Sequence, residues 1–232
     1  MTGPRTWPEV VPLLLTEFRF PDPALATRRG VMVGYAVRHG QGTLLFDTGF
    51  GFGNPALDAA YMPQSRSIVE ALTEAGIDRD DVTAVANCHL HADHAGQNAA
   101  FPGIPIFVQP DEWVAAHTED YTVIDWIDFP GARYEPIAGD HDIADGVRIV
   151  ASPGHTAGHQ SLVVATRDGT LVLAGQACYS VGEWTADPDA LEGRSSAPDG
   201  AAYDRSIERL RGLDPVRVLF AHDRTAWTPR RR

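Results

Sequence analysis

The chain has 232 residues, of which 44% are hydrophobic and 22% are charged, values that are ordinary for a globular protein. Its net charge of −12 repels polyanions, so we expect no nucleic-acid partner. No apolar run approaches the roughly 20 residues that a membrane helix needs, so we expect no membrane partner. The N-terminal stretch MTGPRTWPEVVPLLL is a poor signal peptide, and we therefore expect a cytoplasmic protein.

Hydrophobic alternation, capping residues and turn residues predict the secondary structure along the chain. The predicted elements are hairpin strands at 31–40 and 42–49, a helix at 65–76 with Ser65 as N-cap, strands at 82–88 and 104–108, a helix at 110–117, strands at 146–152, 161–166 and 170–175, a helix at 199–213 and a last strand at 216–223. Clusters of strands with helices between them predict two sheets with outer helices. The stretches 118–136 and 179–199 are expected to be irregular loops of the kind that line sites.

The domain organisation is expected to be simple. The chain has no internal repeat, low-complexity tract or long linker, so we expect a single domain over residues 1–232. Residues 1–30 are expected to form an N-terminal extension before the first strand, and residues 224–232 a flexible tail. The two cysteines do not suggest a disulfide framework.

The segment NCHLHADHAG at 87–96 carries four potential metal ligands within six residues, namely His89, His91, Asp93 and His94. Neutral imidazole and carboxylate are good ligands for zinc and related ions. The segment follows directly after an apolar strand, and its small residues allow the backbone to bend closely around an ion. The spacing therefore predicts a metal site rather than a hydrogen-bonded surface cluster.

Further histidines lie near the ends of two later strands. The segment SPGHTAGH offers His155 and His159, and the last strand ends in AHD with His222. Ligands delivered from the ends of several strands make a preorganised site on a rigid scaffold.

Together these motifs resemble the metallo-β-lactamase superfamily. The resemblance rests on His-x-His-x-Asp-His at 89–94, on SPGHTAGH, on the strand-end histidine and on Asp47 in LLFDTG, and it extends from about residue 31 to 223. It implies an α/β fold of the αββα sandwich type, with the metal site at one edge of the two sheets. It is much less specific for the substrate.

The resemblance also implies the following ligand assignment. The first metal ion would be held by His89, His91 and His155, and the second by Asp93, His94 and His222. Asp47 and His159 would support these ligands by orienting them. Zinc is the expected ion, and other divalent metals are possible.

Gln176 departs from the family pattern. In the family the strand before the last helix usually ends in Gly-Asp, and that Asp bridges both ions, whereas this chain has GQ. Two dications about 3.5 Å apart repel by roughly 19 kcal/mol gross at an effective dielectric near 20, and a neutral amide offsets this poorly. We therefore expect one firmly held ion and a second that is weaker or absent, unless Glu183 or Asp187 replaces the bridging carboxylate.

Tyr179 follows Gln176 by three residues, in GQACY. This spacing resembles the N-acyl homoserine lactone hydrolases, in which a Tyr at this place faces the substrate carbonyl. Its hydroxyl would donate to the developing oxyanion, while an ordinary buried Tyr is the alternative. The implied reaction is attack of a metal-bound hydroxide on a small-molecule lactone or ester, with Asp93 relaying a proton to the leaving alkoxide.

Other functions stay open at this point. A glyoxalase-II type thioesterase would need basic residues for an anionic thiol conjugate, and no such cluster lies near the predicted site loops. The GQACY spacing disfavours β-lactam hydrolysis. A non-catalytic metal-binding protein with an altered second metal site is supported by Gln176 alone. The sequence leaves the acyl-chain length and the oligomeric state open, although Phe18, Phe20, Phe50 and Phe52 could line an apolar wall.

Overall fold

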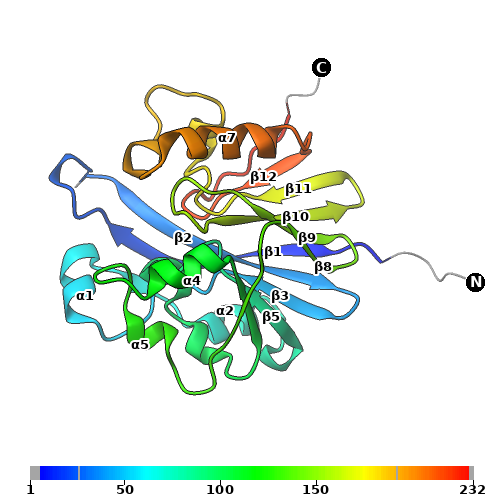
Figure 1. The fold of residues 1–232 in the computed structure, drawn as a ribbon, viewed down its shortest axis with the longest axis horizontal. Coiled ribbons are helices and arrows are strands. Elements are labelled where there is room, and N and C mark those ends of the chain that lie inside the picture. The colour runs from blue at the N-terminus through cyan, green and yellow to red at the C-terminus, as the bar shows by residue number, and fades with distance from the viewer. Residues whose placement is uncertain (1–5, 26, 192, 230–232) are drawn as a thin grey trace, which may run out of the picture.

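The computed structural model describes residues 6–25, 27–191 and 193–229, and its strands form two sheets that pack face to face (Figure 1). In spatial order the first sheet contains β4 (Gln64–Ser65), β1 (Glu9–Arg19), β2 (Arg29–His39), β3 (Gly42–Phe46), β5 (Val82–Ala86), β6 (Pro105–Val108) and β7 (Arg133–Pro136). The second contains β12 (Arg217–Leu219), β11 (Gly169–Leu173), β10 (Gln160–Thr166), β9 (Val147–Ala151) and β8 (His141–Ala144).

Helices cover the outer faces of both sheets, with α7 on one side of the molecule and α1, α2 and α5 on the other (Figure 1). The α-helices are α1 (Pro55–Tyr61), α2 (Ile68–Glu74), α3 (Ala92–Ala95), α4 (Pro110–Ala116), α5 (Ile124–Ile127), α6 (Val181–Trp184) and α7 (Gly200–Arg211). Short 3-10 turns lie at Pro23–Leu25, Arg79–Asp81, Asn98–Ala100 and Arg194–Ser196. The expected αββα sandwich is confirmed.

The central strands are apolar on both faces because each face lies against another layer. In β3, Leu44 and Phe46 enter the core between the two sheets, while Leu45 between them faces the helical layer. In β11, Leu171 and Leu173 face the core between the sheets, while Val172 between them packs against α7, where Tyr203 is fully buried. Because side chains alternate along each strand, the two sheets form three apolar layers: one between the sheets and one beneath the helices on each outer face.

The direction of the strands brings their following loops to one edge of the sandwich. β3, β5 and β6 run parallel to one another in the first sheet, and β11 and β12 run parallel in the second. A backbone hydrogen bond from Val33 N–H to the Ala221 carbonyl, 2.8 Å, joins the two sheets at this edge. All loops with predicted metal ligands start from strand ends here.

The largest difference from the sequence prediction lies at the N-terminus. Residues 9–19, expected in an extension before the first strand, form β1, which pairs along its whole length with β2. That expectation was wrong because Pro8 and Pro12 obscured the strand pattern. Pro12 is tolerated because β4 pairs only with Thr16 and Glu17 of β1, so the other edge of β1 is open at Pro12.

Smaller differences concern the loops and one helix start. The stretch 118–136, expected to be irregular, contains α5 and β7, and 179–199 contains α6. The predicted helix at 65–76 begins after Ser67, because Ser65 belongs to β4.

The C-terminal end differs in part. Trp227, in the expected flexible tail, exchanges two backbone hydrogen bonds with Val218, 2.9 and 3.0 Å, and so continues the second sheet. The basic run 230–232 lies outside the described residues. No helix within the described residues has the length and apolar character that crossing a membrane requires.

The burial of β1 can be tested by truncating Leu15, which is 0% exposed in the core beneath α2. We expect Leu15→Ala to lower the free energy of unfolding by about 2–5 kcal/mol, because it removes buried methyl groups and leaves a cavity. Arg19→Ala, at an exposed position of the same strand, should change it by less than about 0.5 kcal/mol. Denaturant unfolding measures both, and equal effects would show that β1 is not part of the core.

Candidate metal centre

The ligand loops are shaped by the strand ends from which they emerge. The chain leaves β3 at Asp47, whose backbone is left-handed with φ 66°, a conformation that Asp tolerates better than most residues. This turn directs the carboxylate of Asp47 toward the loop after β5, where one oxygen accepts the Cys88 N–H at 2.8 Å. The other oxygen lies 3.0 Å from His94 Nδ1. Asp47 thus contacts the predicted ligand His94 and the backbone next to His89, while its orienting role stays a prediction.

The three histidines predicted for the first ion converge, and we call them the histidine triad: His89, His91 and His155. His91 Nδ1 lies 2.9 Å from His89 Nε2 and 3.4 Å from His155 Nε2. All three ligand atoms lie within 4.8 Å of one another. The triad joins the two sheets, because His89 and His91 follow β5 and His155 follows β9.

The electrostatics of the triad suit a cation. Burial, reinforced by the neighbouring histidines, holds the pKa of His89 and of His155 well below the usual range. Burial also lowers the pKa of His91 to about 4, although Asp93 opposes the shift. Three neutral imidazoles then aim ring nitrogens at one point, where a proton can bridge only a pair of them. A divalent ion satisfies all three, so the residues fit the metal that the sequence predicts.

The second ligand group consists of Asp93, His94 and His222, and it lies beside the triad. His94 Nε2 is 3.2 Å from His222 Nε2, and Asp93 Oδ2 is 3.5 and 3.7 Å from these two nitrogens. The outer nitrogens are fixed, because His222 Nδ1 donates to the Val31 carbonyl at 2.9 Å and His94 Nδ1 faces Asp47. Each ring therefore presents Nε2 to the centre.

Charge in this second group is balanced between acid and base. Burial alone would lower the pKa of His94, but Asp93 and Asp47 raise it to about 9. Burial likewise raises the pKa of Asp93, but His94 and His222 outweigh it and hold that pKa below the usual value. Burial and the nearby His94 lower the pKa of His222 to about 4. A bound cation would stabilise the same carboxylates that a proton on His94 stabilises.

Gln176, the residue that departs from the Gly-Asp expected from the resemblance, closes the second group. Its Oε1 lies 3.1 Å from both His94 Nε2 and His222 Nε2. The amide oxygen therefore faces the ligands but carries no formal charge.

The two acids expected as possible substitutes do not reach this place. Both oxygens of Glu183 are occupied by the N–H groups of Tyr179 and Gly193 and by the Tyr203 hydroxyl. Asp187 accepts the Asp189 N–H at 3.0 Å in its own turn. The bridging position thus remains with Gln176.

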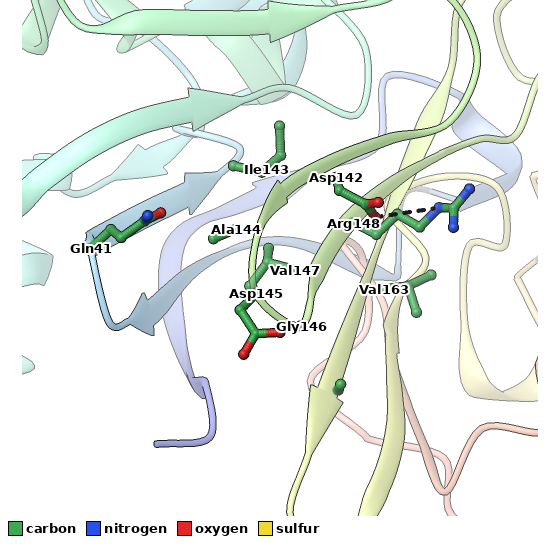
Figure 2. Close-up of a pocket in the computed structure, with 10 residues that line it drawn as sticks. Gln41, Asp142, Ile143, Ala144, Asp145, Gly146, Val147, Arg148 and Val163 are labelled. Carbon is green, nitrogen blue, oxygen red and sulfur yellow. Dashed lines mark ion pairs between the residues drawn. The ribbon is translucent and has the colours of Figure 1, made fainter. Parts of the chain in front are cut away.

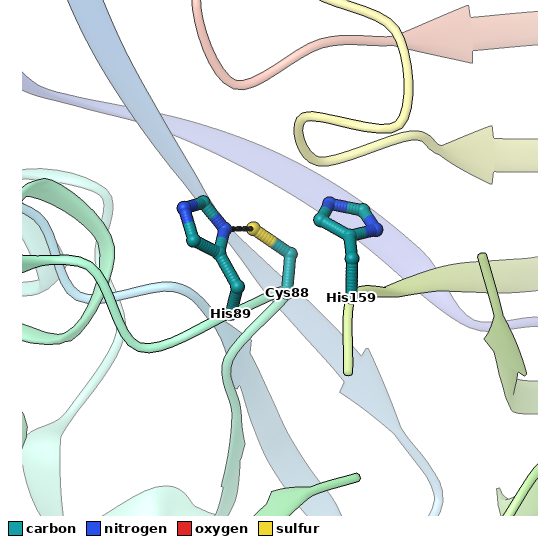
Figure 3. A group of neighbouring side chains, drawn as sticks. All are labelled: Cys88, His89 and His159. Atoms are coloured by element: carbon teal, nitrogen blue, oxygen red, sulfur yellow. Dashed lines mark hydrogen bonds between the residues drawn. The ribbon is translucent and has the colours of Figure 1, made fainter. Parts of the chain in front are cut away.

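Two further residues support the ligands from behind. Figure 3 shows the Cys88 thiol directed at His89, with Sγ 3.1 Å from Nδ1, the ring nitrogen that faces away from the triad. His159 Nδ1 lies 3.0 Å from the Ser152 carbonyl, and its Nε2 accepts the Gln176 N–H at 3.0 Å. His159 therefore fixes the backbone of Gln176, and the orienting role toward the metal ligands that the sequence predicts for it stays a prediction. Sequence reasoning gave Cys88 no such place, although its position next to His89 was a usable signal.

Tyr179 lies at the rim of the second group. Its ring stacks on His222 with centroids 4.5 Å apart and an interplanar angle of 18°. Burial, together with the charge of Asp93, raises the pKa of its phenol well above the ordinary value, so the hydroxyl stays a proton donor. A pocket of about 300 Å³ beside it is lined by both Tyr179 and His222 and by Arg28.

A second pocket, of about 400 Å³, opens on His91 and Asp93. Its walls are largely apolar or aromatic and include Phe50, Leu57, Tyr61, Tyr121 and Val123.

Behind this pocket the expected aromatic wall is partly realised. Phe18 of β1 packs edge-on against Phe20, Phe50 and His222, with centroids 5.3, 5.6 and 6.1 Å away. Phe52, in contrast, is 56% exposed and does not join the wall.

Another hollow, of about 570 Å³, lies at the opposite ends of the strands (Figure 2). It is formed by the β8–β9 hairpin and by Gln41 from the turn between β2 and β3. Its side chains include one exposed ion pair, Asp142 with Arg148 at 3.8 Å, and no histidine or cysteine. This hollow therefore has none of the imidazole or thiol ligands that gather at the metal-ligand edge.

Known proteins share both the sequence pattern and the fold. The chain is 34% identical over 207 residues to an N-acyl homoserine lactonase of a Bacillus species, which covers 82% of this chain and 80% of that protein. It is 33% identical over 181 residues to the N-acyl homoserine lactonase AttM of Azorhizobium caulinodans, covering 72% and 67%.

Solved structures extend the likeness to three dimensions. A variant of AiiA from B. thuringiensis, with N-decanoyl-L-homoserine bound at its active site, superimposes with a TM-score of 0.79 at 25% identity, covering 94% of both chains. An N-acyl homoserine lactone hydrolase with N-hexanoyl-L-homoserine bound at its catalytic metal centre gives 0.77 at 26% identity, covering 95% and 94%. The model of the metallo-beta-lactamase superfamily matches residues 33–222, so the chain belongs to this superfamily.

Proposed function

We propose that the chain is a metal-dependent lactonase that opens N-acyl homoserine lactones or closely similar esters. The observation that carries the proposal is that a largely apolar pocket of about 400 Å³ opens directly on Asp93 and His91. A ligand centre at the end of such a pocket suits a neutral acyl compound with a polar head. The similar proteins named above are lactonases, and two of them hold acyl homoserines at their active sites.

A metal ion bound in this centre would act as a Lewis acid and would lower the pKa of a bound water to about 7. The histidine triad would hold the first ion and the second ligand group the other. Zinc suits this set of imidazoles and one carboxylate. The loops that carry these ligands begin at strand ends of two packed sheets, so the protein holds them in place before substrate arrives.

Tyr179 is proposed to stabilise the oxyanion. Its hydroxyl is a donor because burial raises the pKa of the phenol, and its stacking on His222 fixes the ring at the rim of the centre. As water adds to the lactone carbonyl, negative charge grows on the carbonyl oxygen. A hydroxyl placed in advance stabilises that charge more than it stabilises the neutral substrate.

Asp93 is proposed to move the proton. It lines the substrate pocket and stands beside both His94 and His222. The carboxylate takes a proton from the attacking water as the new carbon–oxygen bond forms. It then delivers this proton to the ring oxygen as the ring carbon–oxygen bond breaks, which yields a hydroxyl and a carboxylic acid, and the acid ionises by losing its own proton to solvent.

The acyl chain is proposed to lie along Phe50, Leu57, Tyr61 and Val123. Contact with these side chains would remove apolar surface of the acyl chain from water, which contributes roughly 25 cal/mol of binding free energy per Å². The charged residues of this pocket within the described chain are Asp93 and Asp120, and neither attracts an anion. This composition favours an acyl lactone over the anionic thiol conjugate of a glyoxalase-II type substrate.

The second ion is proposed to be the weaker one. The triad contributes three imidazoles, whereas the second group replaces the bridging carboxylate of the family by the neutral Oε1 of Gln176. His159 fixes the backbone of Gln176, and neither Glu183 nor Asp187 replaces the missing charge. Repulsion between two dications is therefore offset less than in a site with Asp.

A substrate panel tests the function. We expect the zinc-loaded protein to hydrolyse N-acyl homoserine lactones well above glutathione thioesters and β-lactams, because the pocket that opens on Asp93 is lined mainly by apolar and aromatic side chains and has no Lys or Arg among its described residues. His155→Ala should lose the first ion and the activity while circular dichroism shows an intact fold. Turnover of thioesters alone, or full activity of metal-free His155→Ala, would contradict the proposal.

Tyr179→Phe tests the oxyanion role. The substitution removes one hydroxyl and keeps the ring stacked on His222. We expect kcat to fall by about 10-fold to 10³-fold with a much smaller change in KM, because the lost hydrogen bond forms mainly in the transition state. Steady-state kinetics on one lactone measure both constants. An unchanged kcat would reduce Tyr179 to a packing residue.

Gln176→Asp tests the charge argument. Elemental analysis after dialysis should find one retained ion per native chain and less than one of the second. The substitution should raise the content toward two, because it restores a shared negative charge. Gln176→Asn serves as the control, since it shortens the side chain in the same way without adding charge. Two tightly held ions in the native chain, unchanged by the substitution, would refute the argument.

A further inference from the structure

Glu112 is an acidic residue on a short helix, and its side chain is buried instead of exposed to solvent. It lies in the first turn of α4, yet it is only 1% exposed. Its carboxylate accepts three hydrogen bonds: Oε1 accepts the Leu90 N–H at 2.7 Å and the Tyr121 hydroxyl, and Oε2 accepts the Thr156 hydroxyl at 2.6 Å. Burial of a carboxylate costs desolvation free energy, so a carboxylate is buried only when several hydrogen-bond donors compensate that cost.

Each of the three donors is coupled to a member of the histidine triad. Leu90 lies between His89 and His91, and Thr156 directly follows His155. The Tyr121 ring packs against the imidazole of His91, with centroids 4.6 Å apart. One carboxylate therefore contacts the backbone or side chain next to every ligand of the triad.

These contacts join two separate parts of the fold. Leu90 belongs to the loop after β5 of the first sheet, and Thr156 to the loop after β9 of the second. The second loop lies directly on α4, since a Cβ at Gly158 would come within 2.2 Å of the Glu112 backbone nitrogen. Glu112 thus stands where the two ligand-bearing loops meet.

His155 depends on this contact more than His89 does. The outer nitrogen of His89 faces the Cys88 thiol, whereas the buried Nδ1 of His155 has no hydrogen-bond partner within the described part of the chain. Metal-ligating histidines usually have their orientation set by a partner on that nitrogen. For His155 the restraint passes through the backbone to Thr156 and its bond to Glu112.

We propose that Glu112 is a positioning residue that holds the two halves of the histidine triad at the spacing required by the first metal ion. It touches neither the ion nor the substrate. The inference rests on the proposed assignment of that ion to the triad. Supporting residues of this kind typically change metal affinity by about 10-fold to 100-fold.

The variants separate positioning from general stability. Glu112→Leu removes all three acceptor contacts, and Thr156→Val removes one while keeping the shape of the side chain. Glu112→Gln retains an oxygen for Leu90 and Tyr121, and its amide can donate to the Thr156 hydroxyl. Glu183→Gln is the matched control, because Glu183 also gathers several donors, but these come from Tyr179, Gly193 and Tyr203 and not from the loops of the triad.

The experiment is titration of the metal-free full-length chains with Co²⁺ and Zn²⁺. Affinity for the first equivalent, the Co²⁺ absorption spectrum and the melting temperature of the metal-free form are measured together. We expect Glu112→Leu to weaken the first equivalent by about 10-fold to 100-fold and Thr156→Val by about 10-fold, with altered Co²⁺ bands. Glu112→Gln should stay closest to the native chain, and Glu183→Gln should leave first-ion affinity unchanged even where it lowers the melting temperature.

Three outcomes would overturn the proposal. One is a folded Thr156→Val chain, together with Glu112→Leu where it folds, that keeps native affinity and an unchanged spectrum. Another is a Glu183→Gln chain that weakens the first ion as much as the Glu112 variants do, which would show a general effect of stability. A native chain that binds no first ion would refute the metal assignment of the proposed function as well, and the native titration therefore distinguishes the two failures.

Discussion

The convergence of buried ring nitrogens at one edge of two packed sheets is the constraint on which the rest of the site depends. Neutral imidazoles that point at one another are unfavourable unless a cation lies between them. Burial keeps His89 and His155 neutral, and the packing of the two sheets prevents them from moving apart. The fold therefore provides a strong cation site by bringing together imidazoles that burial keeps unprotonated.

Supporting contacts distribute this constraint over the whole edge. Asp47 sets the ring of His94, the Val31 carbonyl sets that of His222, and His159 holds the turn at Gln176. These contacts span from β2 and β3 in the first sheet to β9 and β11 in the second. The site is thus preorganised by the same interface that buries the central core, so its geometry and the stability of the sandwich are linked.

The two halves of the centre differ in charge and in support. The triad is neutral and is gathered around one buried carboxylate at Glu112, while the second group relies on Asp93 and on the amide of Gln176. Under the proposed assignment, this asymmetry would give one firmly held ion and a second, weaker one beside Asp93, which lines the pocket. On that second side, Asp93 lines the pocket proposed for the substrate, and Tyr179 stacks on His222.

Local patterns in the sequence indicated two sheets with outer helices, and the motifs at 89–94 and at the later strand ends carried the resemblance that implied the family and its αββα sandwich. The sequence did not predict β1, since prolines interrupt the pattern and only pairing with β2 reveals the strand. It also could not reveal that Glu112 and Tyr121 support the triad, or that Glu183 is held away from the bridging position at Gln176 by its own hydrogen bonds. Those roles follow from hydrogen bonds between residues far apart in the chain, and the packing of two sheets and α4, not any local periodicity, decides which of them meet.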